Sequence, residues 1–208
     1  MSNTESLRRR YELVRPRLAE VAESLQEMVE SALTGFRRID RVSFRAKTVE
    51  SFLGKAGAVR ANGEPKYGHP LETMEDLIGG RVLVHFRDDM RQVRERLVPS
   101  LFRVLEDFQH EPEKPWEFSY ESRHIIAQIP TSVEPEGWSS LDERPMHFEL
   151  QIRTLQMHAS AEPTHEPIYK NTSRDSALEK KAAWVAASAW GADQILEEIR
   201  RQADSEPN

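Results

Sequence analysis

The chain has 208 residues, of which 38% are hydrophobic and 31% charged, a balance that predicts one soluble domain with a real core. It contains no cysteine, which excludes disulfides, thiolate metal sites and cysteine nucleophiles. No apolar run approaches the ~18–20 residues that a membrane span requires, and the polar first residues do not read as a secretory signal. We therefore expect a cytoplasmic protein with no membrane partner.

The net charge of −6 argues against nonspecific binding to nucleic acid. The charge is uneven, because residues 1–60 hold 12 Lys/Arg against 8 Asp/Glu, a balance of +4 that leaves −10 for the remainder. The basic part could therefore meet phosphates although the whole chain is acidic.

The first half of the chain alternates helix and strand patterns. Apolar residues at spacings of three and four predict an amphipathic helix over residues 4–33, which Pro16 either kinks or begins. The following segments are expected to be a strand (41–47), a short helix (Val49–Ala58), a loop (Arg60–Pro70), a short helix (Leu71–Leu77) stopped by Gly79-Gly80, a buried strand (Arg81–Phe86), and a helix (Met90–Leu97) capped by Asp88-Asp89.

The second half contains three more strand patterns and a long final helix. A helix that begins at Leu155–Ala161 is expected to be short or broken, because Pro163 follows closely. Trp184 and Trp190 are expected in the core or in an interface. Together the elements predict an α/β or α+β domain, a sheet of about five strands flanked by helices. The remaining segments are the strands Leu101–Phe108, Tyr120–Ile129 and His147–Ile152, the surface loop Pro130–Pro145 and the helix Ser176–Arg201.

A basic cluster stands where the first strand passes into the short helix. Arg45 and Lys47 share one face of the strand. Lys47, Ser51 and Lys55 are four apart, which would stack them if the helix began at Lys47. Three cations and a hydroxyl at a helix N-terminus favour a triphosphate, because free backbone N–H groups and the helix dipole add to the cations. A solvated charged face explains the same residues.

A carboxylate and a guanidinium flank the start of the next strand. Asp76 is of the type that holds Mg²⁺, which takes oxygen ligands and shares them with phosphates. Arg81 could clamp a phosphate through two hydrogen bonds. A helix end with a glycine stop and a surface salt bridge is the plain alternative.

Two later strands carry polar side chains on one face. Tyr120, Ser122 and His124 alternate and would suit a nucleobase, although, taken alone, a tyrosine packed at a strand end with an exposed histidine is the simpler explanation. In the last strand, Glu149, Gln151 and Arg153 alternate with apolar residues. An amphipathic strand explains this alternation, but it does not explain why an acid, an amide and a base follow one another in that order. Glu149 could bind a metal or take a proton from an attacking hydroxyl.

In their order and spacing, these segments resemble the RelA/SpoT-type alarmone synthetases. The resemblance covers roughly residues 40–170 and is most specific in the E-x-Q-I-R-T segment. The matching segments are R-x-K-x3-S-x3-K from Arg45 to Lys55, D-L-x-G-x-R from Asp76 to Arg81, Y-x-S-x-H from Tyr120 to His124, E-x-Q-I-R-T from Glu149 to Thr154, and H-x3-Y-K from His165 to Lys170.

The resemblance implies a fold and a reaction. The fold is a nucleotidyltransferase-like α+β domain over residues 1–208, with its core at about 40–170 and flanking helices at about 4–33 and 176–201. The reaction makes the enzyme a GTP/GDP diphosphokinase: ATP donates its β,γ-diphosphate to the 3′-hydroxyl of GDP or GTP. The products are AMP and (p)ppGpp, the alarmone of the stringent response.

The resemblance also assigns roles to single residues. Tyr120 stacks on the acceptor base, and Glu149 lies close to the 3′-hydroxyl. Mg²⁺ is the implied cofactor. The assigned sets are Arg45, Lys47, Ser51, Lys55 and Arg81 for ATP; Asp76 and Glu149 for the metal; Asp76, Glu149, Arg45 and Lys47 for catalysis; and Tyr120, His124, Gln151, Arg153 and His158 for the acceptor nucleotide.

The departures from the family pattern cluster on the acceptor side. Ser119 and Glu121 stand where glycine and arginine usually flank the tyrosine, and Arg123 replaces an apolar or aromatic residue. Ser160-Ala161, followed by Pro163, replaces a common tryptophan-alanine pair. These changes keep two other acceptors open, adenine nucleotides and the 3′ end of tRNA. Arg8-Arg9-Arg10 and Arg37-Arg38 could serve tRNA phosphates, although a helix face dotted with arginines is the simpler explanation.

Two further hypotheses concern activity and assembly. A degenerate nucleotide-binding module would have no need of paired metal carboxylates, whereas Asp76 and Glu149 are both present. A zinc site is disfavoured, because the seven histidines show no recognised metal spacing. The flanking helices could form the interface of a homo-oligomer, or they could pack within one chain.

Overall fold

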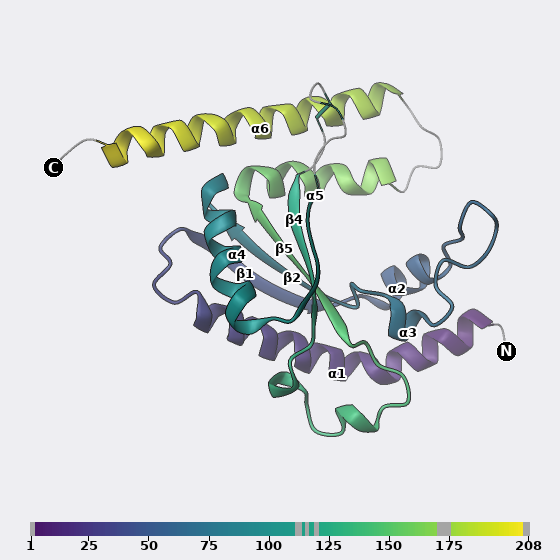
Figure 1. Cartoon of the computed structure of the whole chain (residues 1–208). Coiled ribbons are helices and arrows are strands. Elements are labelled where there is room, and N and C mark those ends of the chain that lie inside the picture. The colour runs from purple at the N-terminus through teal and green to yellow at the C-terminus, as the bar shows by residue number, and fades with distance from the viewer. Residues whose placement is uncertain (1–2, 111–113, 115–116, 119–120, 170–175, 206–208) are drawn as a thin grey trace.

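A five-stranded mixed sheet forms the centre of the computed structural model, with helices on both faces (Figure 1). The structure describes residues 3–110, 114, 117–118, 121–169 and 176–205, with backbone only for residues 3 and 164–169. The fold predicted from the sequence is confirmed. The elements are α1 (Asn3–Ala32), β1 (Ile39–Ala46), α2 (Val49–Ala56), α3 (Pro70–Thr73), β2 (Ile78–Val84), α4 (Arg87–Leu101), β3 (Val104–His110), β4 (Ser122–Gln128), two 3₁₀ turns η1 (Thr131–Val133) and η2 (Trp138–Ser140), β5 (His147–Thr154), α5 (Leu155–Tyr169) and α6 (Ser176–Ser205).

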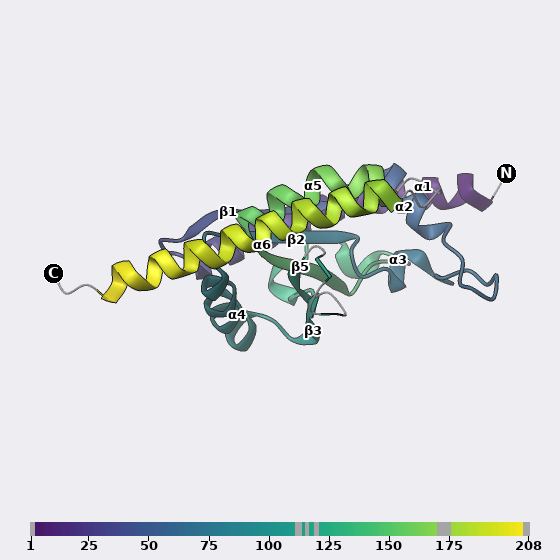
Figure 2. The same ribbon diagram turned by 90° about the horizontal axis from the view of Figure 1, so that it is seen from above.

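The strands lie in the order β1-β2-β5-β4-β3. Only the central pair, β2 and β5, is parallel, and the other three pairs are antiparallel. Because side chains alternate along each strand, this register sorts the sheet into one apolar and one polar face. α1 and α4 pack against the apolar face and enclose the core. α5 lies on the other side of the sheet, and α6 runs along α5 (Figures 1 and 2).

The glycine pair Gly79-Gly80 lies inside β2, so the predicted helix at Leu71–Leu77 with a glycine stop is wrong. α3 ends already at Thr73, and β2 begins at Ile78. Both glycines are paired with β5, and a Cβ atom on Gly80 would lie 2.3 Å from the ring of Phe44 on β1. Glycine is therefore required here by a neighbouring strand, a contact that local patterns cannot report.

The helix α4 begins at Arg87, three residues earlier than predicted, so Asp88 and Asp89 lie in its first turn and do not cap it. Asp89 is buried and forms an ion pair with Arg38 at 2.8 Å. The backbone N–H of Asp88 instead meets Glu197 Oε2 of α6 at 3.4 Å. A helix distant in sequence thus supplies the acceptor that an N-terminus requires.

The helix α5 continues through Pro163 to Tyr169, which contradicts the short or broken helix predicted here. Proline removes one helical hydrogen bond, but α6 packs along α5 and supports it from outside. Trp184 and Trp190 of α6 are 76% and 39% exposed, so of their two predicted places the core is excluded and an interface stays a prediction. In the part of the chain that the structure describes, no helix has the length and hydropathy of a membrane span.

Candidate active site

The polar face of the sheet gathers most of the predicted site residues into adjacent rows. Gly79 of β2 pairs with Arg45 on one side and Glu149 on the other. One row further, Arg81 pairs with Gln151, which pairs with His124 of β4. Side chains in register across neighbouring strands share a face. The antiparallel and parallel pairings therefore bring residues from four segments of the sequence onto one surface.

At the β1 end of this surface, two lysines converge on one carboxylate. Lys47 Nζ lies 2.6 Å and Lys55 Nζ 2.8 Å from the same oxygen, Asp76 Oδ2. α2 begins at Val49 with Thr48 as its N-cap, so Lys47 precedes the helix and the conditional stack of three side chains does not form. The lysines approach Asp76 from two elements, the end of the strand and the last turn of the helix.

Charges around Asp76 fix its protonation. Burial alone would raise the pKa of Asp76, but Lys47 and Lys55 lower it below its usual value. Burial lowers the pKa of Lys55, and the hydrogen bond and charge of Asp76 raise it overall. Both groups are therefore charged at neutral pH. The second oxygen, Asp76 Oδ1, is buried without a hydrogen-bond partner among the described residues, and so fits a cation.

α1 supports this end through contacts that the sequence did not predict. The hydroxyl of Tyr11 donates to the carbonyl of Lys47 at 2.7 Å, and Arg15 Nε donates to the same oxygen at 3.2 Å. Tyr11 also stacks on Phe52 of α2, with ring centroids 4.0 Å apart. Burial, opposed by Arg15, raises the pKa of Tyr11 to about 12. Tyr11 fits the apolar stripe of α1, so its spacing indicates a core residue and hides its polar role.

Further along the face, a chain of hydrogen bonds centres on Glu149. His124 Nδ1 lies 2.6 Å from Glu149 Oε1, and Gln151 Nε2 donates to Glu149 Oε2 at 3.0 Å. Arg153 donates to Gln151 and, through Nε at 3.3 Å, to the buried hydroxyl of Ser122. Burial alone would raise the pKa of Glu149, yet His124 and Gln151 lower it overall, while Asp76 raises it slightly. Glu149 is therefore an anion within electrostatic reach of Asp76.

α5 brings a histidine and an unpredicted acid over β2. Arg81 NH1 forms an ion pair with Glu162 Oε1 at 2.6 Å, and His158 Nδ1 lies 3.9 Å from the same oxygen. Burial, with Arg81, Arg153 and Arg41, lowers the pKa of His158 despite Glu162. The spacing of four between His158 and Glu162 was the available signal for this pair.

Two predicted segments lie partly outside the described residues. Tyr120 and Lys170 lie outside the described residues, as do the side chains of His165 and Tyr169. Phe108 was not predicted, yet it stacks on His124 with centroids 5.3 Å apart.

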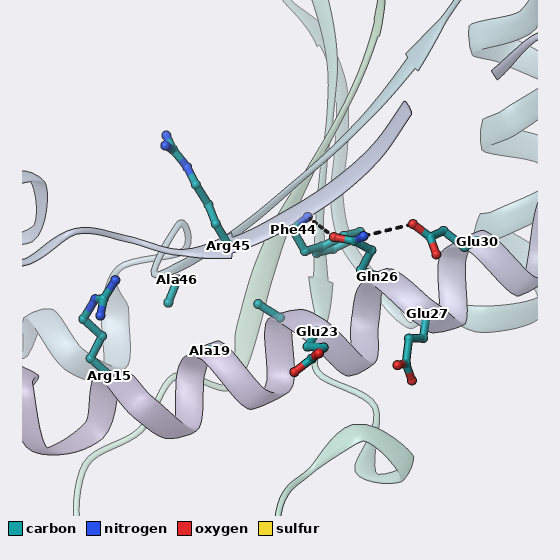
Figure 3. A pocket seen from close by; sticks show the side chains of 10 residues that line it. Arg15, Ala19, Glu23, Gln26, Glu27, Glu30, Phe44, Arg45 and Ala46 are labelled. Carbon is teal, nitrogen blue, oxygen red and sulfur yellow. Dashed lines mark hydrogen bonds between the residues drawn. The ribbon is translucent and has the colours of Figure 1, made fainter. Parts of the chain in front are cut away.

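A groove of about 550 Å³ between α1 and β1 is separate from this site (Figure 3). Its lining includes Arg15, Glu23, Gln26 and Phe44. Arg45 borders it through its backbone side, but its side chain extends from β1 away from α1 (Figure 3). The converging lysines and carboxylates do not line this groove.

Comparison with known proteins agrees with this geometry. A region found in RelA / SpoT proteins matches residues 44–174. The chain belongs to the RelA/SpoT family. It is 32% identical over 166 residues to the GTP pyrophosphokinase YjbM of Bacillus subtilis, an alignment that covers 78% of this chain and 72% of that protein.

Solved structures of RelA/SpoT relatives share the fold. The crystal structure of small alarmone synthetase 1 from Bacillus subtilis superposes with a TM-score of 0.76 at 26% identity, covering 94% of this chain and 98% of that one. The same synthetase bound to its product pppGpp gives a TM-score of 0.73 at 26% identity, covering 92% and 97%. The similarity thus includes the flanking helices as well as the sheet.

Proposed function

We propose that this RelA/SpoT chain transfers the β,γ-diphosphate of ATP to the 3′-hydroxyl of GDP or GTP, making (p)ppGpp and AMP. The observation that carries the proposal is the pair of charged carboxylates, Asp76 and Glu149, on one face with converging lysines. The name of the Bacillus subtilis relative, a GTP pyrophosphokinase, supports the reaction. We also propose a cytoplasmic location, which these nucleotide substrates support.

The donor triphosphate is held by cations. Attack on the β-phosphorus develops negative charge on phosphoryl oxygens, which positioned cations stabilise. Lys47 and Lys55 together exceed the charge of Asp76 by one, so the donor end retains a net positive charge. The proposed donor set is Arg45, Lys47, Ser51, Lys55 and Arg81. Of these, Arg45 and Lys47 also act in catalysis, together with Asp76 and Glu149.

The acceptor hydroxyl meets Glu149. As O3′ bonds to the β-phosphorus, the bond from that phosphorus to the oxygen shared with the α-phosphorus breaks, and that oxygen leaves with AMP. The hydroxyl proton passes to Glu149, which His124 and Gln151 hold in place. Tyr120, His124, Gln151, Arg153 and His158 are the proposed acceptor-side residues.

Asp76 and Glu149 would together hold Mg²⁺. The unpaired Asp76 Oδ1 and the oxygen-only donor set fit this hard cation, which commonly has one or two protein carboxylates and completes its shell with phosphates. The described residues contain no cluster of three or more metal-binding side chains, as expected if substrate phosphates supply the remaining ligands. When bound, the ion supplies charge stabilisation to the transferring group.

The GTP pyrophosphokinase relative favours guanine nucleotides over the alternative acceptors. Ion pairs account for two of the sequence features that had kept those alternatives open. Glu121 pairs with Arg87 at 2.9 Å, which balances its charge. The basic residues of α1 have acidic partners: Arg8 lies near Glu12, Arg9 near Glu5, and Arg10 near Glu143. These arginines therefore form a charge-balanced helix face and do not offer a surface for tRNA.

The test of the acceptor is a transfer assay. Purified protein is incubated with Mg²⁺ and γ-labelled ATP, with GDP, GTP, ADP, ATP or deacylated tRNA in separate reactions and Mn²⁺ as a second metal. We expect label to move to GDP and GTP. Label that moves only to an adenine nucleotide or to tRNA would contradict the proposed acceptor, and binding without any transfer would support the non-enzymatic module.

We also propose that the chain is a single domain that pairs with a second copy through α6. Buried side chains of α1 and of the sheet form one continuous core, which supports one domain over residues 1–208. The outer face of α6 exposes Trp184, Ile195 and Ile199 by 76%, 59% and 56%. An apolar stripe of this kind on the solvent side of a helix indicates an interface.

A further inference from the structure

An aromatic ring that the proposed reaction does not use lies against the acceptor side. Phe108 of β3 stacks on the imidazole of His124, with centroids 5.3 Å apart and planes inclined by 20°. This is the favourable offset arrangement of two rings. Phe108 is 44% exposed and therefore stands outside the main core. Its side chain lies on the polar face of the sheet, beside His124.

A bulge in β3 aims Phe108 at this face. The register of β3 against β4 shifts between Val104, opposite Ala127, and Glu106, opposite Ile126. Ala127 belongs to the core face and Ile126 to the polar face, so the extra residue reverses which side chains point to the site. Beyond the bulge, Phe108 stands directly opposite His124. Bulges commonly re-aim side chains next to functional sites.

The imidazole of His124 connects Phe108 to the carboxylate of Glu149. Glu149 is anionic and can only accept, so the hydrogen bond of 2.6 Å is donated by the Nδ1–H of His124. Rotation of the His124 side chain about its side-chain torsions would break the hydrogen bond to Glu149. Phe108 covers one flat side of the ring, and His110 meets it edge-on with centroids 6.2 Å apart. The two neighbours therefore limit the rotation of His124.

We propose that Phe108 is a positioning residue, which holds His124 in the orientation that fixes the Glu149 carboxylate. The consequence for kcat rests on the proposed function, whereas the orientation of the ring does not. A planar aromatic side chain is required in this role, because an aliphatic chain of similar size cannot lie flat along the imidazole.

The experiment compares Phe108→Leu with Phe108→Tyr. In protein without nucleotide, ¹⁵N-edited NMR at fixed pH reports the hydrogen-bonded Nδ1–H of His124, and steady-state assays give kcat and KM. We expect Phe108→Leu to lose the Nδ1–H signal and to lower kcat about tenfold, while the KM for ATP stays unchanged. Phe108→Tyr should keep both the Nδ1–H signal and the kcat of the unmodified protein. Leu13→Ala, at an exposed apolar position on α1 away from the bulge, is the control and should change neither.

An unchanged His124 signal in Phe108→Leu would overturn the proposal, and so would a Tyr variant that fails as badly as the Leu variant. If the unmodified protein transfers no label, the proposed function fails, but the NMR comparison still decides whether Phe108 orients His124.

Discussion

Asp76 is the point at which donor-side charges meet. A buried carboxylate between two ammonium groups remains ionised, and the pair of lysines leaves a surplus positive charge beside it. In the proposed function, this surplus would attract the triphosphate, while Asp76 Oδ1, which has no hydrogen-bond partner among the described residues, would accept a cation. One residue would thus organise both components of a metal–nucleotide complex.

In the proposed donor site, Arg81 would have to leave Glu162 before it could bind phosphate. It is paired with Glu162, and because both side chains are partly exposed the pair is worth roughly 0–1 kcal/mol. We predict that Glu162→Gln lowers the KM for ATP by up to about fivefold with kcat unchanged. Steady-state kinetics check this, with Glu95→Gln, an exposed partner of Arg91, as control. A raised KM would mean that Glu162 holds Arg81 in its binding orientation.

Residues with a fixed spacing within one segment could be predicted from the sequence. Lys47, Lys55 and Asp76 follow from motif spacing, and the structure brings them together. Glu162 and Phe108 could not be found in this way. Glu162 was hidden by the expected break at Pro163, and the bulge in β3 placed Phe108 on the face opposite to that of regular alternation.

The helix α6 is docked through buried polar groups. Asp193, 1% exposed, accepts a hydrogen bond from Thr154 at the end of β5 at 2.7 Å. Glu197, 5% exposed, meets the N-terminus of α4 and pairs with Arg200 at 2.5 Å. Charged groups are seldom buried without partners, so this network fixes where α6 can lie relative to α4 and β5.

Asp193 makes the stability of the packing between α6 and β5 depend on pH. Burial, reinforced by Glu121 and Glu197 and opposed by Thr154 and Arg87, raises the pKa of Asp193 to about 6. The folded protein then binds this proton more tightly than the unfolded chain. The stabilisation from the group is present below about pH 4 and is lost as pH rises through about 6.

The variant Asp193→Asn keeps an acceptor for Thr154 and removes the charge. We predict that it raises the free energy of unfolding at pH 7.5 by up to about 3 kcal/mol and that this gain shrinks as pH falls toward 4. Urea unfolding at several pH values measures it, with the exposed Asp204→Asn as control. A loss of stability at pH 7.5 would show that the charge is needed for docking.

Element boundaries were predicted well where the local sequence pattern sets them. They were predicted poorly where contacts with a neighbouring strand or helix set them. α1 and α6 follow from their periodicity and composition. Gly79-Gly80 looked like a helix stop, but the close approach of Phe44 requires a small residue within β2. At Pro163 the local signal to break a helix was overridden by packing against α6.

At the scale of the whole molecule, the proposed interface is the outer face of α6, whose residue pattern fits a two-fold pairing with a second copy. Trp184, Ser188, Gly191 and Ile195 fall on one stripe at helical spacing. If two α6 helices cross antiparallel about a point between residues 189 and 190, Trp184 lies opposite the partner subunit's Ile195. Lys181 then lies opposite the partner subunit's Glu198, which adds complementary charge.

We predict a dimer in sedimentation equilibrium, and Ile195→Glu should make it a monomer with an unchanged circular dichroism spectrum. Lys181→Glu and Glu198→Lys should each weaken association, and the two changes together should restore it. Leu13→Glu, at an exposed apolar position on α1, is the matched control. A monomeric unmodified protein at 100 μM, on the order of ten times a typical assay concentration, would contradict the interface.

The central claim is that Asp76 and Glu149 carry the transfer. The most direct measurement is the rate of label transfer from ATP to GDP at saturating nucleotide, for the unmodified protein, Asp76→Ala and Glu149→Ala. Circular dichroism and thermal unfolding of each variant verify its fold. We predict that either substitution lowers the rate by about 10³-fold or more while the protein remains folded. A folded variant of either kind with near-normal transfer would contradict the assignment of the active site.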